Sequence, residues 1–300
     1  MYTEHFGLTE LPFTLTPNTH FFLNMPTHQE ALNLIMVALA GGDGFVKVVG
    51  EVGTGKTLLC RKLLNALDDE QYVTAYIPNS QLSPDAFRKS FAQEVGIDVQ
   101  GMDSFALLDA INHRLIALAQ EQRKVVLLVD EAQAIPEETV EALRLLTNLE
   151  TESSKLFQVV LLGQPELDEL LSRKSLRQLL QRITFSYQLK HLDVEAVGHY
   201  IDQRIQRAGF EGMSLFKRDA AKLIAKASDG VPRLINILSH KSLLSAYGKG
   251  DLIVDRTHVK RAIEDTQGVS APVTPVSFLW GVLGSLILLS AALAYLRFSG

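Results

Sequence analysis

Short apolar runs alternate with longer amphipathic stretches over the first two thirds of the chain. The runs are rich in β-branched and aromatic residues, and we predict strands at 45–49, 72–77, 125–129, 156–162 and 183–189. Between them, apolar residues at helical spacing predict helices at 57–67, 84–95, 104–120, 137–149 and 175–181. Alternating strands and helices, with nearly continuous apolar strands, indicate a parallel sheet covered on both faces, a three-layer α/β fold.

Beyond this part the pattern becomes purely helical. Helices at about 193–208, 217–228, 233–247 and 256–265 predict a small all-helical domain at 191–265. At the other end, residues 1–26 are rich in aromatics and turn formers, and we expect an ordered arm on the body surface. Thr27 is the expected N-cap of a helix through Ala40, which opens an α/β core at 27–190.

The C-terminal part predicts a membrane span. Residues 266–276 carry a glycine and two prolines and predict a linker. Residues 277–296 are 20 positions without a charge, and as a helix they extend about 30 Å, the thickness of a hydrocarbon core. Trp280 and Tyr295 lie near the two ends, as is typical of a membrane interface. A buried core helix is the alternative, but soluble helices usually carry a polar face.

Composition fits a folded protein of about two domains. The chain has 300 residues, of which 47% are apolar, and 29 basic against 34 acidic residues give a net charge of −5. This balance argues against an overall field that attracts nucleic acid, while a local basic patch stays open. The single Cys60 excludes an internal disulfide and a Cys-based zinc site. The chain opens without the basic and apolar regions of a signal peptide.

The first chemical motif follows the strand at 45–49. GEVGTGKT at 50–57 fits the phosphate-binding P-loop at every fixed position, between a strand and a helix. Its glycines allow close approach of the backbone, and the loop N–H groups with the helix N-terminus attract phosphate. We expect Lys56 to reach the β- and γ-phosphates and the Thr57 hydroxyl to ligate Mg²⁺. The residues expected to bind ATP are Gly50, Glu51, Val52, Gly53, Thr54, Gly55, Lys56, Thr57 and Leu58.

Two carboxylates end the strand at 125–129. We expect Asp130 to hold the water shell of Mg²⁺ and Glu131 to polarise the attacking water, because phosphoryl transfer needs positioning and charge neutralisation. An apolar strand followed by Asp-Glu is common, so the motif indicates nucleotide hydrolysis only together with the P-loop upstream. A protein that binds the nucleotide without splitting it is the alternative.

Two further candidates are placed by position. Gln164 follows the strand at 156–162, where a polar side chain can contact the γ-phosphate or the attacking water. Arg233 lies where GVPR at 230–233 opens a helix of the second domain, from which it can fold onto the phosphates. A loop-entry glutamine and a surface arginine are the alternatives.

The charge distribution is uneven. From Asp130 to Glu152 there are seven acids and one base, and from Arg173 to Lys190 five bases and no acid. The basic segment can contact nucleic acid, or the acidic segment of a neighbouring subunit in a head-to-tail ring, or only solvent. In a ring, a finger arginine for the neighbour's nucleotide comes from this segment, with Arg182 the first choice and Arg177 the second.

The motifs together resemble those of the AAA+ ATPases of the secretion-type ExeA/GspA family, and in particular those of mannose-sensitive haemagglutinin (MSHA) type IV pilus biogenesis. The resemblance implies a P-loop AAA+ core with a helical lid, a sensor-1-like Gln164, a sensor-2-like Arg233 and a bacterial inner-membrane setting. The segments that carry it are YTEHFGLTELPFTLTPNTHFF at the start, HQEAL at 28–32, GEVGTGKTLLCR at 50–61, LLVDEAQ at 127–133, LLGQPEL at 161–167, LRQLLQRITFSYQL at 176–189 and GVPRLIN at 230–236.

One departure separates the chain from part of this family. ExeA/GspA-like secretion proteins continue past the membrane helix into a periplasmic peptidoglycan-binding region, whereas four residues follow Leu296 here. We therefore expect no direct cell-wall binding, and the pilus-type relatives fit better.

The expected function is that of a single-pass inner-membrane ATPase with its ATPase domain on the cytoplasmic side, because its substrate is ATP. It is expected to form a homo-oligomeric ring and to assemble or regulate a type IV pilus or a type II secretion apparatus through inner-membrane assembly proteins. We do not expect nucleic acid as a partner. The alternatives are a DNA-associated AAA+ ATPase, like the transposition helpers, and a scaffold ordered by nucleotide without hydrolysis.

Overall fold

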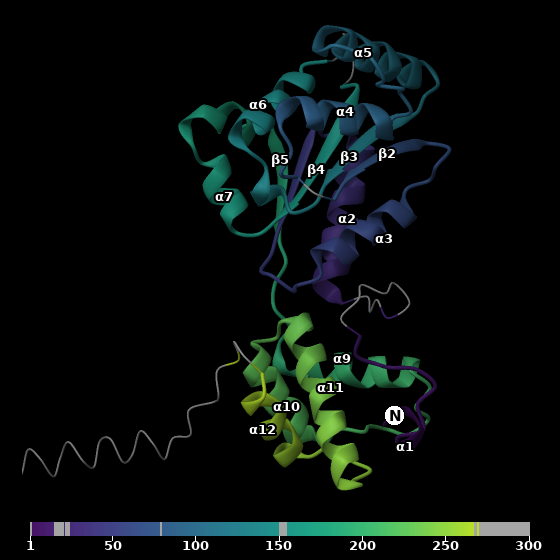
Figure 1. The fold of residues 1–300 in the computed structure, drawn as a ribbon, viewed down its shortest axis with the longest axis vertical. Helices are drawn as coiled ribbons and strands as arrows, with labels where there is room; N and C mark the ends of the chain where they lie inside the picture. Colours follow the sequence, from purple (N-terminus) through teal and green to yellow (C-terminus); the bar gives the residue numbers. More distant parts are fainter. Residues whose placement is uncertain are drawn as a thin grey trace, which may run out of the picture.

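The protein is seen in a computed structural model that describes residues 2–14, 21, 25–78, 80–149, 155–266 and 269. It shows an α/β body and a helical body, joined end to end in Figure 1. The strands lie in the first body, and the helices from α9 (Val194–Arg207) onward form the second. The separation of mixed and purely helical parts follows the change in sequence pattern after residue 190.

A five-stranded parallel sheet forms the centre of the α/β body. Its order is β2-β3-β4-β1-β5, so the first strand of the chain lies inside the sheet, beside β4 and β5. All the predicted strands are present, within one residue at each end. Their bounds are β1 (Phe45–Val49), β2 (Tyr72–Ile77), β3 (Lys124–Val129), β4 (Phe157–Gly163) and β5 (Ile183–Gln188). Because the strands are parallel, their carboxyl ends meet at one edge, where Val49 is in register with Gly163.

Helices cover both faces of the sheet, which confirms the three-layer prediction. On one face, α2 (Pro26–Gly41) and α3 (Lys56–Ala66) share a buried cluster with alternate residues of β1, such as Val46 and Val48. The cluster on the other face contains residues of α4 (Pro84–Glu94), α5 (Ser104–Gln120), α6 (Glu137–Leu146) and α7 (Glu166–Leu171). Burial on two faces explains why the central strands are mostly apolar, with Lys47 on β1 and Gln158 on β4 as buried polar exceptions.

Three details of the helix predictions were wrong. Thr27 is not an N-cap, because α2 begins at Pro26 after Met25; proline lacks the N–H that a cap would satisfy and suits the first helical position. The helix predicted at 137–149 ends earlier, at Leu146. The helix predicted at 175–181 is shorter and continues a 3₁₀ turn (Lys174–Leu176) as α8 (Arg177–Leu180). The short helices α1 (Tyr2–His5) and α7 were not predicted.

The N-terminal arm packs into the helical body rather than on its surface. Tyr2, Phe6 and Phe13 are at most 4% exposed and share a cluster with α9. The buried guanidinium of Arg204 on α9 donates from Nε to the Pro12 carbonyl at 2.6 Å and lies over the Phe13 ring. In Figure 1 residues 2–14 of the arm run along this body, away from the sheet. Tyr2, Phe6 and Phe13 therefore belong to the core of the helical body.

The helical body is completed by α10 (Arg218–Ser228), α11 (Pro232–Lys249) and α12 (Arg256–Glu264). None of the helices within the described ranges is long and apolar enough to cross a bilayer. The predicted span at 277–296 and most of the predicted linker at 266–276 lie outside those ranges. The membrane helix thus stays a prediction.

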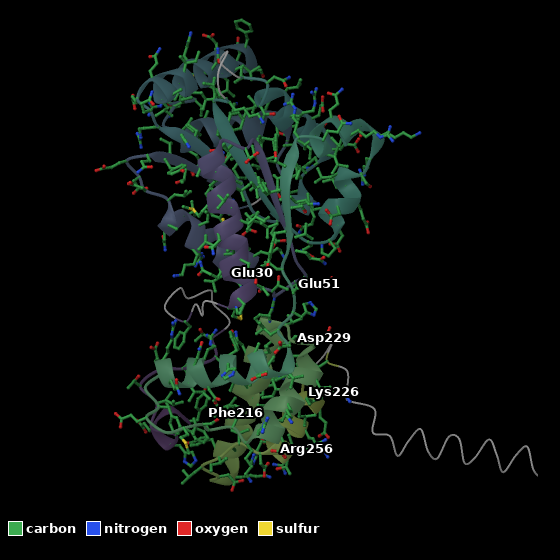
Figure 2. All side chains as sticks on the ribbon, turned by 180° about the vertical axis from the view of Figure 1, so that it is seen from behind. Glu30, Glu51, Phe216, Lys226, Asp229 and Arg256 are labelled. Atoms are coloured by element: carbon green, nitrogen blue, oxygen red, sulfur yellow. The ribbon has the colours of Figure 1, made fainter. Side chains whose placement is uncertain are left out.

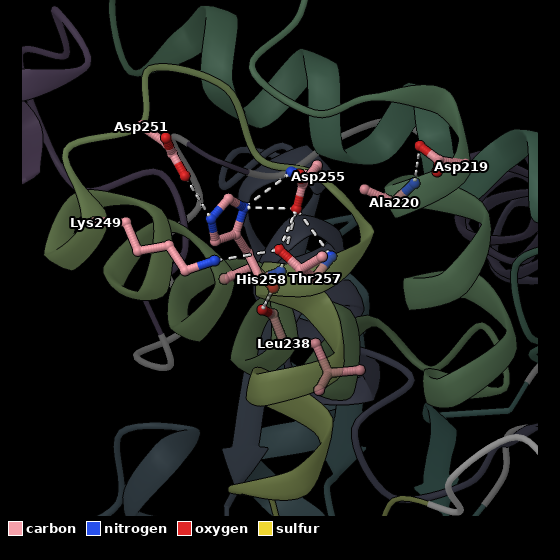
Figure 3. Close-up of polar contacts among 9 residues, drawn as sticks. Asp219, Ala220, Leu238, Lys249, Asp251, Asp255, Thr257 and His258 are labelled. Atoms are coloured by element: carbon pink, nitrogen blue, oxygen red, sulfur yellow. Dashed lines mark hydrogen bonds and ion pairs between the residues drawn. The ribbon is translucent and has the colours of Figure 1, made fainter.

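A hydrogen-bonded cap fixes the start of α12 (Figure 3). Asp255 accepts from the backbone N–H and hydroxyl of Thr257 at 2.9 and 2.7 Å, while its own backbone N–H donates to Nδ1 of His258. The other ring nitrogen of His258 lies 3.0 Å from the Asp251 carboxylate. These polar groups satisfy one another under a helix end, where unpaired donors would be costly.

We predict that Asp255→Ala lowers the free energy of unfolding by about 1 kcal/mol, because the helix loses its cap. The hydrogen bond from Thr257 is the main cause that lowers the pKa of Asp255 from 3.8 to about 2. The carboxylate therefore stabilises the fold fully above about pH 4, and this contribution is lost as the pH falls towards 2. Denaturant unfolding at several pH values measures both effects. Asp255→Asn retains a good cap, and an equal loss in that variant would contradict the capping role.

Candidate nucleotide-binding site

The P-loop joins the end of β1 to the start of α3. It packs in close contact with His28 and Arg233. Gly53 and Gly55 have φ values of 85° and 97°, which L side chains rarely adopt. A Cβ on Gly55 would lie 2.8 Å from Nε2 of His28, and one on Gly53 would lie 2.6 Å from Cβ of Arg233. The loop conformation and its two contacts both require glycine at these positions.

Lys56 is the first residue of α3, and its side chain folds back onto the P-loop. Its Nζ donates to the carbonyl oxygens of Gly50 at 2.7 Å and Glu51 at 3.0 Å. Burial lowers the pKa of this lysine, and the nearby carboxylates of Glu131 and Asp130 oppose the shift. The ammonium group is thus held over the loop among acceptors and carboxylates.

Asp130 follows the last residue of β3 and is 2% exposed. Burial raises its pKa, and a hydrogen bond with the Thr57 side chain lowers it in part. A threonine hydroxyl and a carboxylate in contact are a hard-oxygen pair, and Mg²⁺ is usually held by one or two such protein groups. These residues therefore fit the expected magnesium ligands. Among the described residues, no larger group of His, Cys, Asp and Glu is suited to a metal ion.

Glu131 adopts a left-handed backbone conformation, with φ 50° and ψ 39°. Such a conformation costs a non-glycine residue about 1–3 kcal/mol. Its carbonyl accepts from Oγ of Ser80 at 2.6 Å, and its Oε2 accepts from Nε2 of Gln133 at 2.7 Å and Nε2 of Gln164 at 3.0 Å. Hydrogen bonds to a charged group contribute about 1.5–3 kcal/mol each, so these contacts offset the strain.

The protonation state of Glu131 is also controlled. Burial raises its pKa, but the amide hydrogen bonds from Gln133 and Gln164 and the charge of Lys56 outweigh burial and lower the pKa overall. The group is therefore a carboxylate at neutral pH. A carboxylate held at a fixed place beside a phosphate site is able to orient a water molecule.

A cavity of about 350 Å³ lies between the P-loop and the helical body. The P-loop and the start of α3 line one wall; Tyr200, Arg204 and Asn236 line the other. The two bodies touch here, since the backbone N–H of Arg233 donates to the Gly53 carbonyl at 3.2 Å. Figure 2 shows the same junction from behind, with Glu51 on one side and Asp229 on the other.

Most of the predicted site residues meet at this cavity. Lys56, Thr57, Glu131, Gln164 and Arg233 line it, as do Val52, Gly53, Gly55 and Leu58. The P-loop residues Gly50, Glu51 and Thr54 do not line the cavity. The roles assigned to these side chains stay predictions, although the geometry brings them together.

The two candidate finger arginines lie elsewhere. Arg182 donates to Oγ1 of Thr147 at 2.9 Å and to Oδ1 of Asn148 at 2.7 Å, just beyond α6. Arg177 is exposed, and neither arginine lines the cavity of its own chain. Part of the basic segment is used within the chain, because Arg173 pairs with Glu137 at 2.9 Å.

Two contacts of the site were missed by the sequence analysis. His28 is 3% exposed, and its Nε2 donates to the Thr54 carbonyl at 2.8 Å, because a carbonyl oxygen can only accept. Burial lowers the pKa of the ring and favours its neutral form. Gln133 binds Glu131, as described above. Both lie in segments that carried the family resemblance, HQEAL and LLVDEAQ, but a histidine or glutamine alone has no distinctive spacing that reveals such a role.

Comparisons with known proteins show which domain family, relative and fold the chain resembles. Residues 39–171 match the AAA domain family AAA_22. The chain is 37% identical over 298 residues to General secretion pathway protein A of Aeromonas hydrophila, a match that covers 97% of the chain and 53% of that protein. The chain therefore spans about half the length of this curated relative.

Two solved structures share the fold. Cdc6p from Pyrobaculum aerophilum has a TM-score of 0.66 at 17% identity, covering 86% of this chain and 72% of the other. The Aeropyrum pernix ORC2 protein, solved as ADPNP-ADP complexes, has a TM-score of 0.61 at 17% identity, covering 85% and 72%.

Fold, site and domain match together define a P-loop NTPase with an AAA domain. Its 37% identity to General secretion pathway protein A supports the ExeA/GspA-like family as the one this chain resembles.

We predict that His28→Ala weakens nucleotide binding about 5–10-fold, because the P-loop loses a hydrogen bond worth about 1 kcal/mol. Fluorescence titration with a labelled ATP analogue measures the affinity. His199→Ala is the matched control, since that side chain is 74% exposed. Equal affinities of the two variants would show that His28 has no part in holding the loop.

Proposed function

We propose that this protein is an ATPase that hydrolyses ATP at the P-loop cavity to assemble or regulate a pilus or secretion apparatus. The observation that carries the proposal is the Glu131 carboxylate, held by two side-chain amides within a cavity that also contains Lys56 and Thr57. Nucleotide binding alone needs only the loop. Hydrolysis also requires a fixed, ionised carboxylate beside the loop.

Each residue has a part in the proposed reaction. Lys56 leaves the carbonyl oxygens of Gly50 and Glu51 to bind phosphate oxygens, and Glu131 orients the attacking water. Gln164 and Arg233, which lie on opposite sides of the cavity, contact the γ-phosphate from the sheet and from the helical body. Thr57 and Asp130 would hold Mg²⁺, which, when bound, neutralises charge on the phosphates.

The biological setting rests on the relative and on the C-terminal pattern. General secretion pathway protein A, by its name, belongs to a secretion pathway, and identity to it over most of the chain supports a secretion-type role. The pilus-type member MshM, of MSHA pilus biogenesis, is the particular likeness that we propose. The apolar segment at 277–296 would anchor the protein in the bacterial inner membrane, with the ATPase domain in the cytoplasm. The expectation that nucleic acid is not a partner stays a prediction.

A ring assembly is the proposed oligomer. The surface around Arg182 supports it, because Leu145 on α6 is 50% exposed and Leu180 on α8 is 41% exposed. Apolar side chains beside an arginine and beyond the chain's own cavity suit a contact with a second copy of the chain. Arg182, or Arg177 in its place, would then approach the nucleotide of the neighbour.

We predict that the unaltered chain releases phosphate from ATP, and that Lys56→Ala and Glu131→Gln each lower the turnover at least about 100-fold. The two variants differ in binding: Lys56→Ala loses affinity for ATP, whereas Glu131→Gln keeps it. Phosphate release and analogue titration measure the two quantities. The exposed residues Lys89 and Glu121 provide the controls Lys89→Ala and Glu121→Gln.

Undiminished turnover in both site variants would reject the catalytic assignment. Nucleotide-dependent assembly of the unaltered chain without any phosphate release would select a scaffold function instead.

We predict that Arg182→Ala lowers turnover at least about 10³-fold if Arg182 is the finger, and Arg177→Ala does so in the alternative case. Mixing the inactive Arg182→Ala and Lys56→Ala chains should restore part of the activity, because one supplies an intact P-loop and the other an intact arginine. Lys226→Ala, on the helical body in Figure 2, is the control. Full turnover in both arginine variants, or no recovery on mixing, would contradict a shared site.

A further inference from the structure

The side chain of Gln133 joins two parts of the catalytic edge. Its Nε2 donates to Oε2 of Glu131 at 2.7 Å, and its Oε1 accepts from the backbone N–H of Gln164 at 3.0 Å. The side chain of Gln164 closes the triangle by donating to the same Oε2 at 3.0 Å. Gln133 does not line the cavity itself, so it acts on the site through Glu131 and Gln164.

The backbone contact decides the orientation of the Gln133 amide. Because Gln164 N–H is a donor, it must face the oxygen end of that amide, and the NH₂ end is then directed at Glu131. With both amide donors on Oε2, the other carboxylate oxygen of Glu131 stays available to a water molecule. The network thus assigns Oε2 of Glu131 to the two amides and leaves Oε1 for water.

The local fold is built to allow this contact. The left-handed conformation of Glu131 starts a 3₁₀ turn (Ala132–Ala134), which returns Gln133 to the carboxylate. Opposite it, Gly163 ends β4, and a Cβ there would lie 3.3 Å from Oε1 of Gln133 and 2.8 Å from Cδ2 of Leu167. The strained turn and the missing Cβ together bring Gln133 between β3 and β4.

We propose that Gln133 is a positioning residue for ATP hydrolysis, which holds Glu131 in place while the side chain of Gln164 exchanges that carboxylate for the γ-phosphate. The inference rests on the proposed function. Once a nucleotide is bound, the side chain of Gln164 can donate either to Glu131 or to the γ-phosphate. Gln133 is oriented by the backbone N–H of Gln164, which does not move with the Gln164 side chain. Gln133 is therefore the contact that persists through the exchange.

The test replaces Gln133 by methionine, which has a similar volume and length but lacks both hydrogen bonds. We expect the kcat of the full chain for ATP to fall about 10–100-fold, because a displaced catalytic group is costly, while ATP affinity changes less than twofold. Gln133→Glu keeps the acceptor for Gln164 but sets a second carboxylate against Glu131, so its kcat should fall further. Gln120→Met, at an exposed position, is the matched control.

A double-mutant cycle separates positioning from a merely structural effect. In the Glu131→Gln background, Gln133→Met should lower the residual turnover less than twofold, because the group it positions has already been removed. An equal fold-loss in both backgrounds, or an unchanged kcat in Gln133→Met alone, would overturn the inference. So would a fall in ATP affinity or in the unfolding midpoint that matches the loss of kcat.

Failure of the proposed function has a different signature. If the unaltered chain binds ATP and releases no phosphate, the ATPase assignment is wrong and the positioning role falls with it. If the unaltered chain turns over and Glu131→Gln does not, while Gln133→Met matches the unaltered rate, only the positioning role is wrong.

Discussion

The close packing of the P-loop against a helix on each side is the constraint on which the site depends. His28 of α2 holds the loop through the Thr54 carbonyl, and Arg233 of α11 holds it through the Gly53 carbonyl. Both neighbours come so near that any side chain on Gly53 or Gly55 would overlap them. The same glycines that let phosphates approach also allow these close contacts between the loop and its neighbours.

Hydrogen bonds of the loop and its neighbours explain how unlike charges are kept together at a buried edge. Lys56 uses carbonyl acceptors of the loop, Asp130 uses Thr57, and Glu131 uses two amides, so each charge has a hydrogen-bond partner of its own. Buried charges without such partners would lose several kcal/mol of solvation. Burial still lowers the pKa of Lys56 and raises that of Asp130, and the neighbouring groups oppose both shifts. For Glu131 the amides and Lys56 outweigh burial, so its pKa is lowered and the group is ionised, the state that orients water.

Much of the fold follows from periodicity, because strands buried on both faces must be apolar and their parallel arrangement requires helices between them. The P-loop and Asp130-Glu131 also follow, since their spacing is tied to strand ends. Thr27 failed as a cap because Pro26, one position earlier, starts the helix without one. Some positions depend on contacts between segments far apart in sequence: His28 contacts Thr54, and the buried Lys47 pairs with Asp168. The position of Gln133 depends on an unusual turn. No local sequence pattern reveals such contacts.

The arm contacts one wall of the cavity, although the two are far apart in the sequence. Arg204 is buried under the arm, where it binds the Pro12 carbonyl and the Tyr200 hydroxyl, and Tyr200 in turn donates to Asn236. Tyr200, Arg204 and Asn236 line the cavity opposite the P-loop. The arm is therefore connected to this wall of the cavity through a buried cation and three hydrogen bonds, without passing through the sheet. Since Arg233 lies on the same helix as Asn236, the wall that the arm supports is also the one that carries the proposed phosphate sensor.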